Sequence, residues 1–219
     1  MSDLVLHYAP DNASLCVRLA LEAAHLRFDT RLVDRAAQGQ KSPEFRALNP
    51  NGLIPVLETP DGPLFETAAI LLWLAERAPA LMPQQGPTRA MAHKWLIWMA
   101  NTLHPTLRML FYPTQFIAPE HAADLSIRTV ERLCEQLQIL NDGVAGAPWI
   151  GGSAPSILDC YLCPMLRWIQ LYPKDAPRRP HLPDYPALLA IAASCSMPTA
   201  GSAFSPSMPY ACPRSPSAG

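Results

Sequence analysis

The chain has 219 residues, of which 49% are hydrophobic and 16% are charged, and its formal net charge is −1. A chain of this size can bury one large core or two smaller ones, and the near-zero charge gives no electrostatic basis for binding nucleic acid or an anionic membrane. Because neither a signal pattern nor an apolar run of membrane-spanning length is present, we expect a cytoplasmic protein. Its six cysteines are then expected to be reduced rather than bridged.

Short strands and helices alternate in the first part of the chain. Leu4–Tyr8 is a short apolar strand, and Ser14 can cap a helix that runs to about His25. Phe28–Val33 alternates apolar and polar residues, which is typical of a half-buried strand. Ser42–Glu44 has a cap, a proline and an acid in the order of a helix start. The pattern therefore predicts strand, helix, strand, helix.

A hairpin and a third helix follow. Asn49–Gly52 is a turn cluster, and the branched apolar residues of Leu53–Thr59 indicate a strand. Pro60–Pro63 has the composition of a hairpin turn, after which the chain returns as a second strand. A helix opens at Glu66–Thr67, because apolar residues recur from there at helical spacing. The predicted order of this half is β-α-β-α-β-β-α.

Two features of this hairpin suit a short anionic peptide. Pro55 cannot donate to a strand ladder, so it lies at an edge, at a bulge or in a cis turn. A strand that stops at a cis proline leaves the N–H and C=O of Ile54 free to pair with an extended peptide. The helix start at Glu66 and Thr67 presents unpaired N–H groups that favour a carboxylate. Either feature alone is more often an ordinary edge strand or helix cap, but together they predict a binding site.

The second half of the chain shows only helical patterns. Helices are predicted at 88–108, 119–141, 156–171 and 185–193. The first of them is expected to bend near Pro105, which lacks a backbone donor, and Ser156–Asp159 resembles a capping box. Residues 194–219 are rich in Ser, Pro, Ala and Gly and are predicted to be disordered.

The segment NPNGLIPVLE, followed by FETAAILLWLAE, resembles the glutathione-binding half of the cytosolic glutathione transferases, and the chain is closest to their bacterial beta class. The resemblance runs from Leu4 to about Leu189 and is strongest up to Glu76. It implies a homodimeric enzyme that adds the glutathione thiolate to a small hydrophobic electrophile. Glutathione would be the co-substrate, and no other cofactor and no metal site is expected.

The resemblance also implies an α+β fold with two domains. A thioredoxin-like, glutathione-binding domain would span residues 1–79, and an all-α helical bundle that carries the substrate pocket would span residues 88–193. The family would continue with a charged amphipathic helix where this chain has its tail, so residues 194–219 are atypical. A loosened bundle or an open substrate pocket would be the consequence.

Glutathione-binding residues follow from the same resemblance. In the family, the residue before a cis proline pairs with the cysteinyl part of glutathione, and an acidic residue followed by Ser or Thr holds the γ-glutamyl end. The matching residues here are Ile54, Pro55, Glu66 and Thr67. Lys41, Gln40 or Arg35 could reach the glycine carboxylate, although a solvated loop is the default interpretation for each of them.

The thiol-activating loop departs from the family pattern. The position of the beta-class cysteine falls on Ala13, and we hypothesise that the Ser14 hydroxyl or the Asn12 amide binds the glutathione sulfur instead. The alternatives are a helix cap for Ser14 and a plain loop residue for Asn12. His104 lies in a beta-class-like stretch and could donate to, or protonate, a sulfur or a substrate; alternatively it is a surface or capping histidine.

Two other functions remain open. The altered loop and tail would suit a non-catalytic adaptor with the same fold, and Cys16 could serve a glutathione-dependent thiol reductase, although a small buried residue is the commoner interpretation. Cys160 and Cys163 form a C-x-x-C motif inside an apolar helix. Because no second pair and no histidine lies nearby, a redox or zinc role is not expected for this motif.

Overall fold

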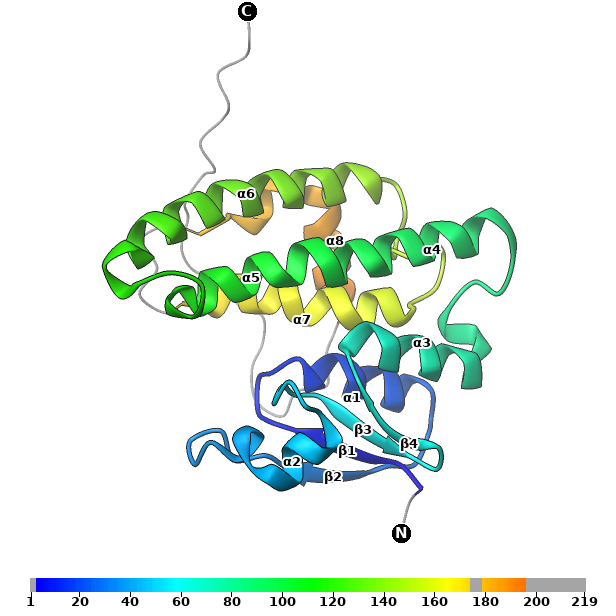
Figure 1. Cartoon of the computed structure of the whole chain (residues 1–219). Helices are drawn as coiled ribbons and strands as arrows, with labels where there is room; N and C mark the ends of the chain where they lie inside the picture. The colour runs from blue at the N-terminus through cyan, green and yellow to red at the C-terminus, as the bar shows by residue number, and fades with distance from the viewer. Residues whose placement is uncertain (1–2, 174–178, 196–219) are drawn as a thin grey trace, which may run out of the picture.

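The computed structural model describes residues 3–173 and 179–195. Four strands form one mixed sheet: β1 (Val5–Tyr8), β2 (Asp29–Leu32), β3 (Val56–Thr59) and β4 (Gly62–Phe65). Their order in the sheet is β2-β1-β3-β4, with β2 parallel to β1 and with β3 antiparallel to both β1 and β4. The sheet lies in the lower layer of the molecule in Figure 1, beneath a layer of helices.

The first half contains three helices in the predicted order: α1 (Ser14–Ala23), α2 (Pro43–Leu48) and α3 (Thr67–Arg77). α1 and α3 pack together and separate the sheet from the upper helices (Figure 1). Phe45 of α2 forms a second, smaller apolar cluster with Val33 and Val56. The β-α-β-α-β-β-α order and its mixed sheet make this half thioredoxin-like, as predicted.

The second half is helical. Its main helices are α4 (Gly86–Trp98), α5 (His104–Phe111), α6 (Ala122–Gly143), α7 (Ile157–Leu171) and α8 (Pro186–Ser194). A π-helical turn, Met99–Leu103, joins α4 to α5, so the predicted irregularity near Pro105 is present as a change of helix type. Among the described residues, no strand of the sheet follows β4.

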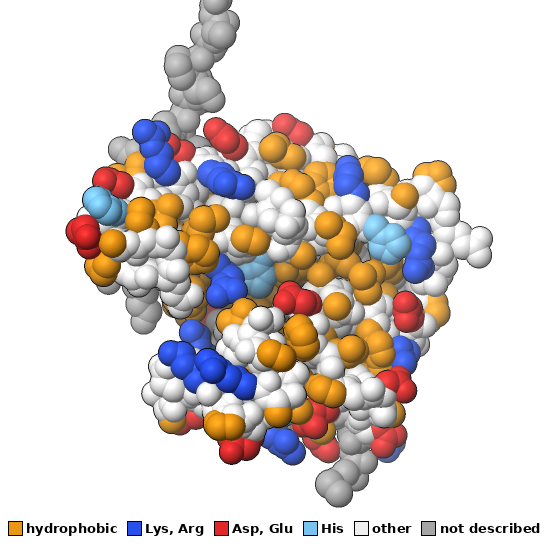
Figure 2. Space-filling model, in the orientation of Figure 1, with side chains coloured by type: hydrophobic (Ala, Val, Ile, Leu, Met, Phe, Trp, Pro, Cys, Tyr) orange, Lys and Arg blue, Asp and Glu red, His pale blue; other side chains and the backbone are white. Residues whose placement is uncertain are grey.

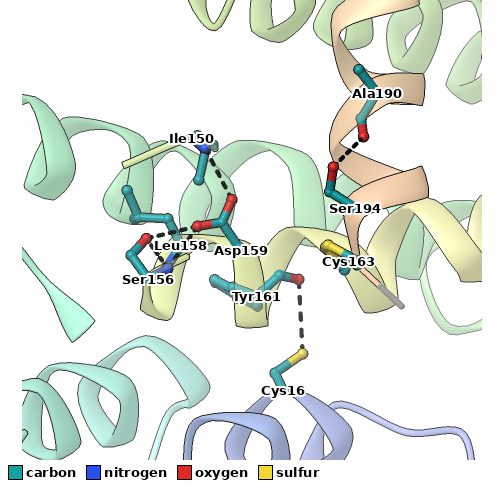
Figure 3. The surroundings of a disulfide bond; sticks show 10 residues. Cys16, Ile150, Ser156, Leu158, Asp159, Tyr161, Cys163, Ala190 and Ser194 are labelled. Atoms are coloured by element: carbon teal, nitrogen blue, oxygen red, sulfur yellow. Dashed lines mark hydrogen bonds between the residues drawn. A yellow bond between two sulfur atoms is a disulfide. The ribbon is translucent and has the colours of Figure 1, made fainter. Parts of the chain in front are cut away.

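One apolar core continues through both halves. α7 packs against α1 and α3, and residues of all three helices belong to the same buried cluster. At this junction the Cys16 thiol lies 3.8 Å from the carbonyl oxygen of Tyr161, and both residues are almost fully buried (Figure 3). The helices of the sheet-bearing half therefore pack directly against the helical bundle. The predicted boundary between residues 79 and 88 stays a prediction.

The start of α7 confirms the predicted capping box. Both the N–H and the hydroxyl of Ser156 donate to the Asp159 carboxylate, at 2.8 and 2.9 Å, and the Ile150 N–H donates to its other oxygen at 2.9 Å (Figure 3). Burial raises the pKa of Asp159 while these bonds oppose the rise. The box thus ties the loop before α7 to its first turn.

Three predictions need correction or stay outside the described residues. A disulfide joins Cys163 to Cys195, so the expectation of six reduced cysteines was wrong for this pair: packing of α7 on α8 brings the two residues together, which an argument from compartment cannot detect. The strand β2 is exposed at all four residues rather than half-buried, and of the predicted Phe28–Val33 only the two flanking residues, Phe28 and Val33, are covered. Of the predicted disordered tail, residues 196–219 lie outside the described part.

Candidate functional site

Most of the predicted binding residues lie at one end of the sheet. The register pairs Tyr8 with Leu32, His7 with Val56, and Val56 with Phe65. The loops that follow β1 and β2, the approach to β3 and the start of α3 therefore meet at this end. Segments that are far apart in the sequence can contribute to one site there.

The Ile54–Pro55 peptide bond is cis, as predicted. No hydrogen bond joins the Ile54 main chain to another residue in the described part of the chain, so its N–H and C=O remain available. Buried Asn49 supports this turn, because its amide donates to the Leu53 carbonyl at 2.7 Å. Gly52 is required by space, since a Cβ there would lie 2.8 Å from the Gln40 carbonyl oxygen.

Glu66 lies next to this open main chain. Because Val56 pairs with Phe65, Pro55 is directly across from Glu66 on the neighbouring strand. Glu66 has a φ of 70°, an unusual conformation for a non-glycine residue that occurs most often at functional sites. Its side chain is exposed and forms no ion pair with another described residue.

α3 begins directly after Glu66. The first N–H to bond within it is that of Ile70, which donates to the Glu66 carbonyl at 3.0 Å, so the N–H groups before Ile70 have no helical partner. Thr67 is buried at this helix start, with 7% of its surface exposed. A free carboxylate and a helix N-terminus thus lie side by side, which suits a ligand that carries both an ammonium and a carboxylate.

The thiol-activating loop is arranged differently from the prediction. The N-cap of α1 is Ala13, so the expectation that Ser14 caps this helix was wrong. Ser14 is 2% exposed, and its hydroxyl donates to the Ala9 carbonyl at 3.2 Å and accepts from the Ala9 N–H at 3.3 Å. These bonds close the turn after β1. Ser14 holds the loop in shape, because both roles of its hydroxyl are used within the loop.

Asn12 has an oxygen, Oδ1, that is buried and has no hydrogen-bond partner among the described residues. A buried polar atom without a partner is costly, so such atoms usually bind water or a ligand. α1 begins just after Asn12, and the Leu15 N–H of this helix donates to the Asn12 carbonyl. The start of α1 therefore lies next to the Asn12 side chain. Asn12 is therefore the polar side chain of the loop that remains available to a ligand.

Asp11 anchors the loop to the helical half, and no pattern in the sequence indicated this contact. With a φ of 48°, it directs its carboxylate toward the end of α7. Its Oδ1 accepts from Trp168 Nε1 at 3.1 Å and from Arg167 Nε at 3.4 Å, and its Oδ2 accepts from the Tyr172 hydroxyl at 2.6 Å. Asn12 is therefore held in place by donors from a distant segment.

His104 lies on the bundle side of the junction. Its Nδ1 is 2.9 Å from the Tyr161 hydroxyl, and its ring is 6.0 Å from that of Trp168. Burial, helped by the positive charge of Arg108, lowers the pKa of His104 to about 4. The ring is therefore neutral at neutral pH. Burial also raises the pKa of Tyr161, with nearby Cys16 and Glu66 adding to the effect.

The predicted basic residues separate into two groups. Lys41 is exposed on a short 3-10 turn, Gly39–Lys41, which packs against Gly52 through the Gln40 carbonyl. Arg35 extends in another direction and donates from Nη2 to the Tyr112 hydroxyl, 3.1 Å away at the end of α5. Lys41 thus stays near the hairpin end, while Arg35 connects the sheet end to the bundle.

A cleft of about 350 Å³ lies at this end of the sheet. It is lined by Ala9, Pro10, Leu32, Val33, Asp34 and Arg35. Figure 2 shows a notch on the left between the helical layer and the sheet-bearing layer, with basic side chains on both sides of it. The cleft offers apolar walls and a guanidinium next to the loop that carries Asn12.

The cysteines of this region are not reactive thiols. Cys16 has no exposed surface, and burial raises its pKa well above the ordinary value. Burial raises the pKa of Cys160 to about 12, and its C-x-x-C partner Cys163 is bonded to Cys195. A thiolate is the reactive form of cysteine, so neither free side chain is suited to disulfide exchange. The described residues contain no cluster of three side chains suited to a metal, and none of their helices is long and apolar enough to cross a membrane.

Comparisons with known proteins agree with this geometry. A family model described as the glutathione S-transferase N-terminal domain matches residues 13–77. The disulfide-bond oxidoreductase YfcG of Escherichia coli is 33% identical over 195 residues, which cover 84% of this chain and 85% of that protein. Glutathione S-transferase GST-4.5 of Xanthomonas campestris is 30% identical over 167 residues, with 74% of this chain and 81% of that protein covered.

Solved structures are similar over nearly the whole chain. A glutathione transferase from Burkholderia graminis, crystallised with two glutathione molecules per subunit, is 29% identical with a TM-score of 0.80. The match covers 90% of this chain and 85% of that one. A second structure, from Methylococcus capsulatus, is 30% identical with a TM-score of 0.73 and covers 89% of this chain and 94% of that one.

Proposed function

The chain belongs to the glutathione transferase family, and on this premise we propose that it binds glutathione and directs the glutathione thiolate at a small hydrophobic electrophile. One observation carries the proposal: the open main chain of Ile54 lies beside the free carboxylate of Glu66 and the N-terminus of α3. The cysteinyl part of glutathione would pair with Ile54. Its γ-glutamyl ammonium would bind Glu66, and its α-carboxylate would bind the start of α3.

The glycine end of the peptide would extend along the hairpin turn. Lys41 lies on the turn that packs against Gly52, so its ammonium is the basic group of this region that suits the glycine carboxylate. Arg35 is less suited to this role, because its bond to Tyr112 directs its guanidinium toward the bundle rather than along the hairpin turn. Ile54, Pro55, Glu66, Thr67 and Lys41 are therefore the proposed glutathione-binding residues.

The sulfur would lie between the hairpin and the loop after β1. A free thiol has a pKa of about 8.5, and a helix N-terminus or a hydrogen-bond donor lowers it. The N–H groups at the start of α1 and the NH2 group of Asn12 are donors of this kind, whereas the unpaired Asn12 Oδ1 is an acceptor and would not stabilise a thiolate; Ala13 supplies no donor from its side chain. Ser14 supports this arrangement through its bonds to Ala9. We propose Asn12 as the sulfur ligand and Ser14 as the residue that shapes its loop.

His104 would contribute as a neutral group. Its pKa of about 4 leaves no charged imidazolium at neutral pH, so it cannot act there as a cationic acid. In the proposed reaction the thiolate forms a carbon–sulfur bond with the electrophile, and the leaving group departs with the electron pair. No proton transfer from His104 is then required. Its bond to Tyr161 would instead shape the bundle side of the pocket.

A second candidate is glutathione-dependent disulfide exchange, which the name of the 33% identical E. coli relative favours. The buried Cys16 is not suited to this reaction, so both reacting sulfurs would come from the ligands. The thiolate of bound glutathione would attack a disulfide, form a new sulfur–sulfur bond and release the other sulfur as a thiolate. This exchange uses the same hairpin and the same Asn12 environment as conjugation does.

Glutathione titration and two turnover assays separate these functions. Calorimetry should detect glutathione binding, and the ultraviolet absorbance of the bound thiolate should give a thiol pKa below that of free glutathione. Conjugation of chlorodinitrobenzene then reports transfer, and reduction of a glutathione mixed disulfide reports exchange. Binding without either turnover would support the adaptor function, whereas no binding at all would disprove the proposal. Light scattering would test the proposed homodimer, and cell fractionation would test the proposed cytoplasmic location.

A further inference from the structure

Arg35 lines the cleft beside the proposed glutathione site, and it contacts the end of the helix that carries Arg108. Arg35 is exposed, and its contacts among the described residues are with Tyr112: the bond of 3.1 Å to the hydroxyl and a position 5.9 Å from the ring centre. No carboxylate within the described ranges pairs with Arg35. An arginine that lines a cleft without an acidic partner is suited to an anionic ligand.

Arg108 is on the same face of the bundle. The Tyr112 N–H donates to the Arg108 carbonyl at 2.9 Å as the closing bond of α5, and Tyr112 itself, with a non-helical φ of −135°, directly follows the last turn of this helix. One turn earlier on this face is His104, whose titration is affected by Arg108. Arg108 is half-buried and likewise forms no ion pair with a described carboxylate. Through its bond to Tyr112, Arg35 of the sheet layer thus reaches the end of the helix that carries Arg108.

The acidic groups near this opening do not cancel the two charges. Asp34 lines the cleft and keeps its single negative charge, because the N–H groups of Ala36 and Ala37 that bond to its Oδ1, at 2.9 and 3.1 Å, are neutral. Asp11 is bonded to the end of α7, where Arg167 is one of its partners. Glu66 is the carboxylate assigned above to the ammonium of glutathione. Arg35 and Arg108 together outweigh the single charge of Asp34, and Figure 2 shows basic side chains on both sides of the notch.

We propose that the second substrate is an anion, a small hydrophobic molecule that carries a carboxylate, and that Arg35 and Arg108 bind this carboxylate. Its apolar part would lie against the cleft wall formed by Ala9, Pro10 and Val33. This inference rests on the proposed function, since it names the substrate class of that site. A disulfide of glutathione, which carries carboxylates of its own, belongs to the same class.

A matched pair of probes tests the proposal. Dinitrobenzoate and dinitrobenzene differ by one carboxylate, and each is titrated calorimetrically into the glutathione-loaded full chain at one fixed ionic strength. Dinitrobenzoate should bind about tenfold more tightly, which is the size expected of one charge-assisted hydrogen bond. Arg35→Gln and Arg108→Gln should each remove most of this preference, and Arg35→Lys should retain part of it. Arg132→Gln, an exposed arginine on α6, is the control and should leave the preference unchanged.

Each alternative outcome is decisive. Equal affinity of the wild type for both probes, or an unchanged preference in both glutamine variants, would overturn the proposal. Weaker glutathione binding in Arg35→Gln would assign Arg35 to the glutathione site and would overturn its role here. If the wild type binds no glutathione, the proposed function fails, and titration of both probes into the free protein still measures the preference for the anion. The two failures are therefore distinguishable.

Discussion

The two sides of the candidate site are built in different ways. The hairpin side, from Ile54 to Thr67, is formed within one short stretch of chain by the register of β3 on β4. The loop side depends on Asp11, whose partners Trp168 and Tyr172 follow it by 157 and 161 residues. Binding of a peptide can therefore depend on local structure alone. The environment of the peptide's sulfur, in contrast, requires the second half of the chain to be folded and packed against the first.

This difference predicts that mutations on the two sides have separable effects. Changes at the hairpin end should weaken glutathione binding and leave the chemistry of bound thiol intact. Changes in the loop and in the bundle residues behind it should alter thiol reactivity or stability with little effect on binding. The following experiments test this division, beginning with the largest expected effect.

The pH dependence of stability tests the bundle side first. Because the pKa of His104 is lowered from 6.5 to about 4, the unfolded state binds more protons than the folded state between these values. The contribution of neutral His104 to the free energy of unfolding is thus fully present above pH 6.5 and is lost as the pH falls to about 4. This contribution is about 3 kcal/mol. Denaturant unfolding across this range should show a smaller loss in His104→Gln than in the wild type. An identical loss in both would contradict the role of His104.

Glu66→Gln tests the hairpin side. Removing the carboxylate that would bind the glutathione ammonium should weaken glutathione binding by about tenfold or more, as expected for a charged hydrogen bond. The thiol pKa of the glutathione that still binds should not change, because Glu66 lies at the other end of the ligand. Calorimetry and ultraviolet titration measure the two quantities. Glu76→Gln, on the same helix, is the matched control. A shifted thiol pKa would contradict the division between the two sides.

Asp11→Asn tests the loop side. Asparagine keeps the size of the side chain but loses the charge that Arg167, Trp168 and Tyr172 share, so Asn12 should be held less firmly. We expect kcat to fall by about tenfold and the pKa of bound thiol to rise, with the Kd for glutathione changed much less. Asp3→Asn serves as the control. If kcat and Kd change together, Asp11 has a general structural role rather than a role in positioning Asn12.

Ser14→Ala should have the smallest effect. Its hydroxyl bonds only within the loop, to Ala9, so its loss should cost about 1 kcal/mol of stability. The thiol pKa of bound glutathione should remain as in the wild type, whereas Asn12→Ala should raise it. The same ultraviolet titration measures both variants. A raised thiol pKa in Ser14→Ala alone would restore the hypothesis that the Ser14 hydroxyl binds the sulfur.

Several sequence predictions were confirmed because their causes are local. The cis peptide bond before Pro55, the capping box at Ser156–Asp159 and the order of strands and helices each depend on residues that are neighbours in the chain. Others failed because their causes are not local. Ser14 was expected to cap α1 but bonds to Ala9, and the Cys163–Cys195 disulfide depends on how α7 and α8 pack. The exposure of all four β2 residues likewise depends on which elements cover the sheet.

The order of apolar and turn residues was sufficient to indicate the alternating strands and helices of the first half, the helices of the second half and the hairpin that places Pro55 beside a helix start, because short-range sterics and hydrogen bonding decide these features. Only the tertiary structure decided that Asp11 is held by α7, that His104 is half-buried and neutral, and that Arg35 meets the end of α5 at Tyr112. Desolvation and contacts across the junction of two layers are sums over many distant residues. A local sequence pattern cannot predict effects that many distant residues produce together, so the chemistry of the site can be described only from the packed structure.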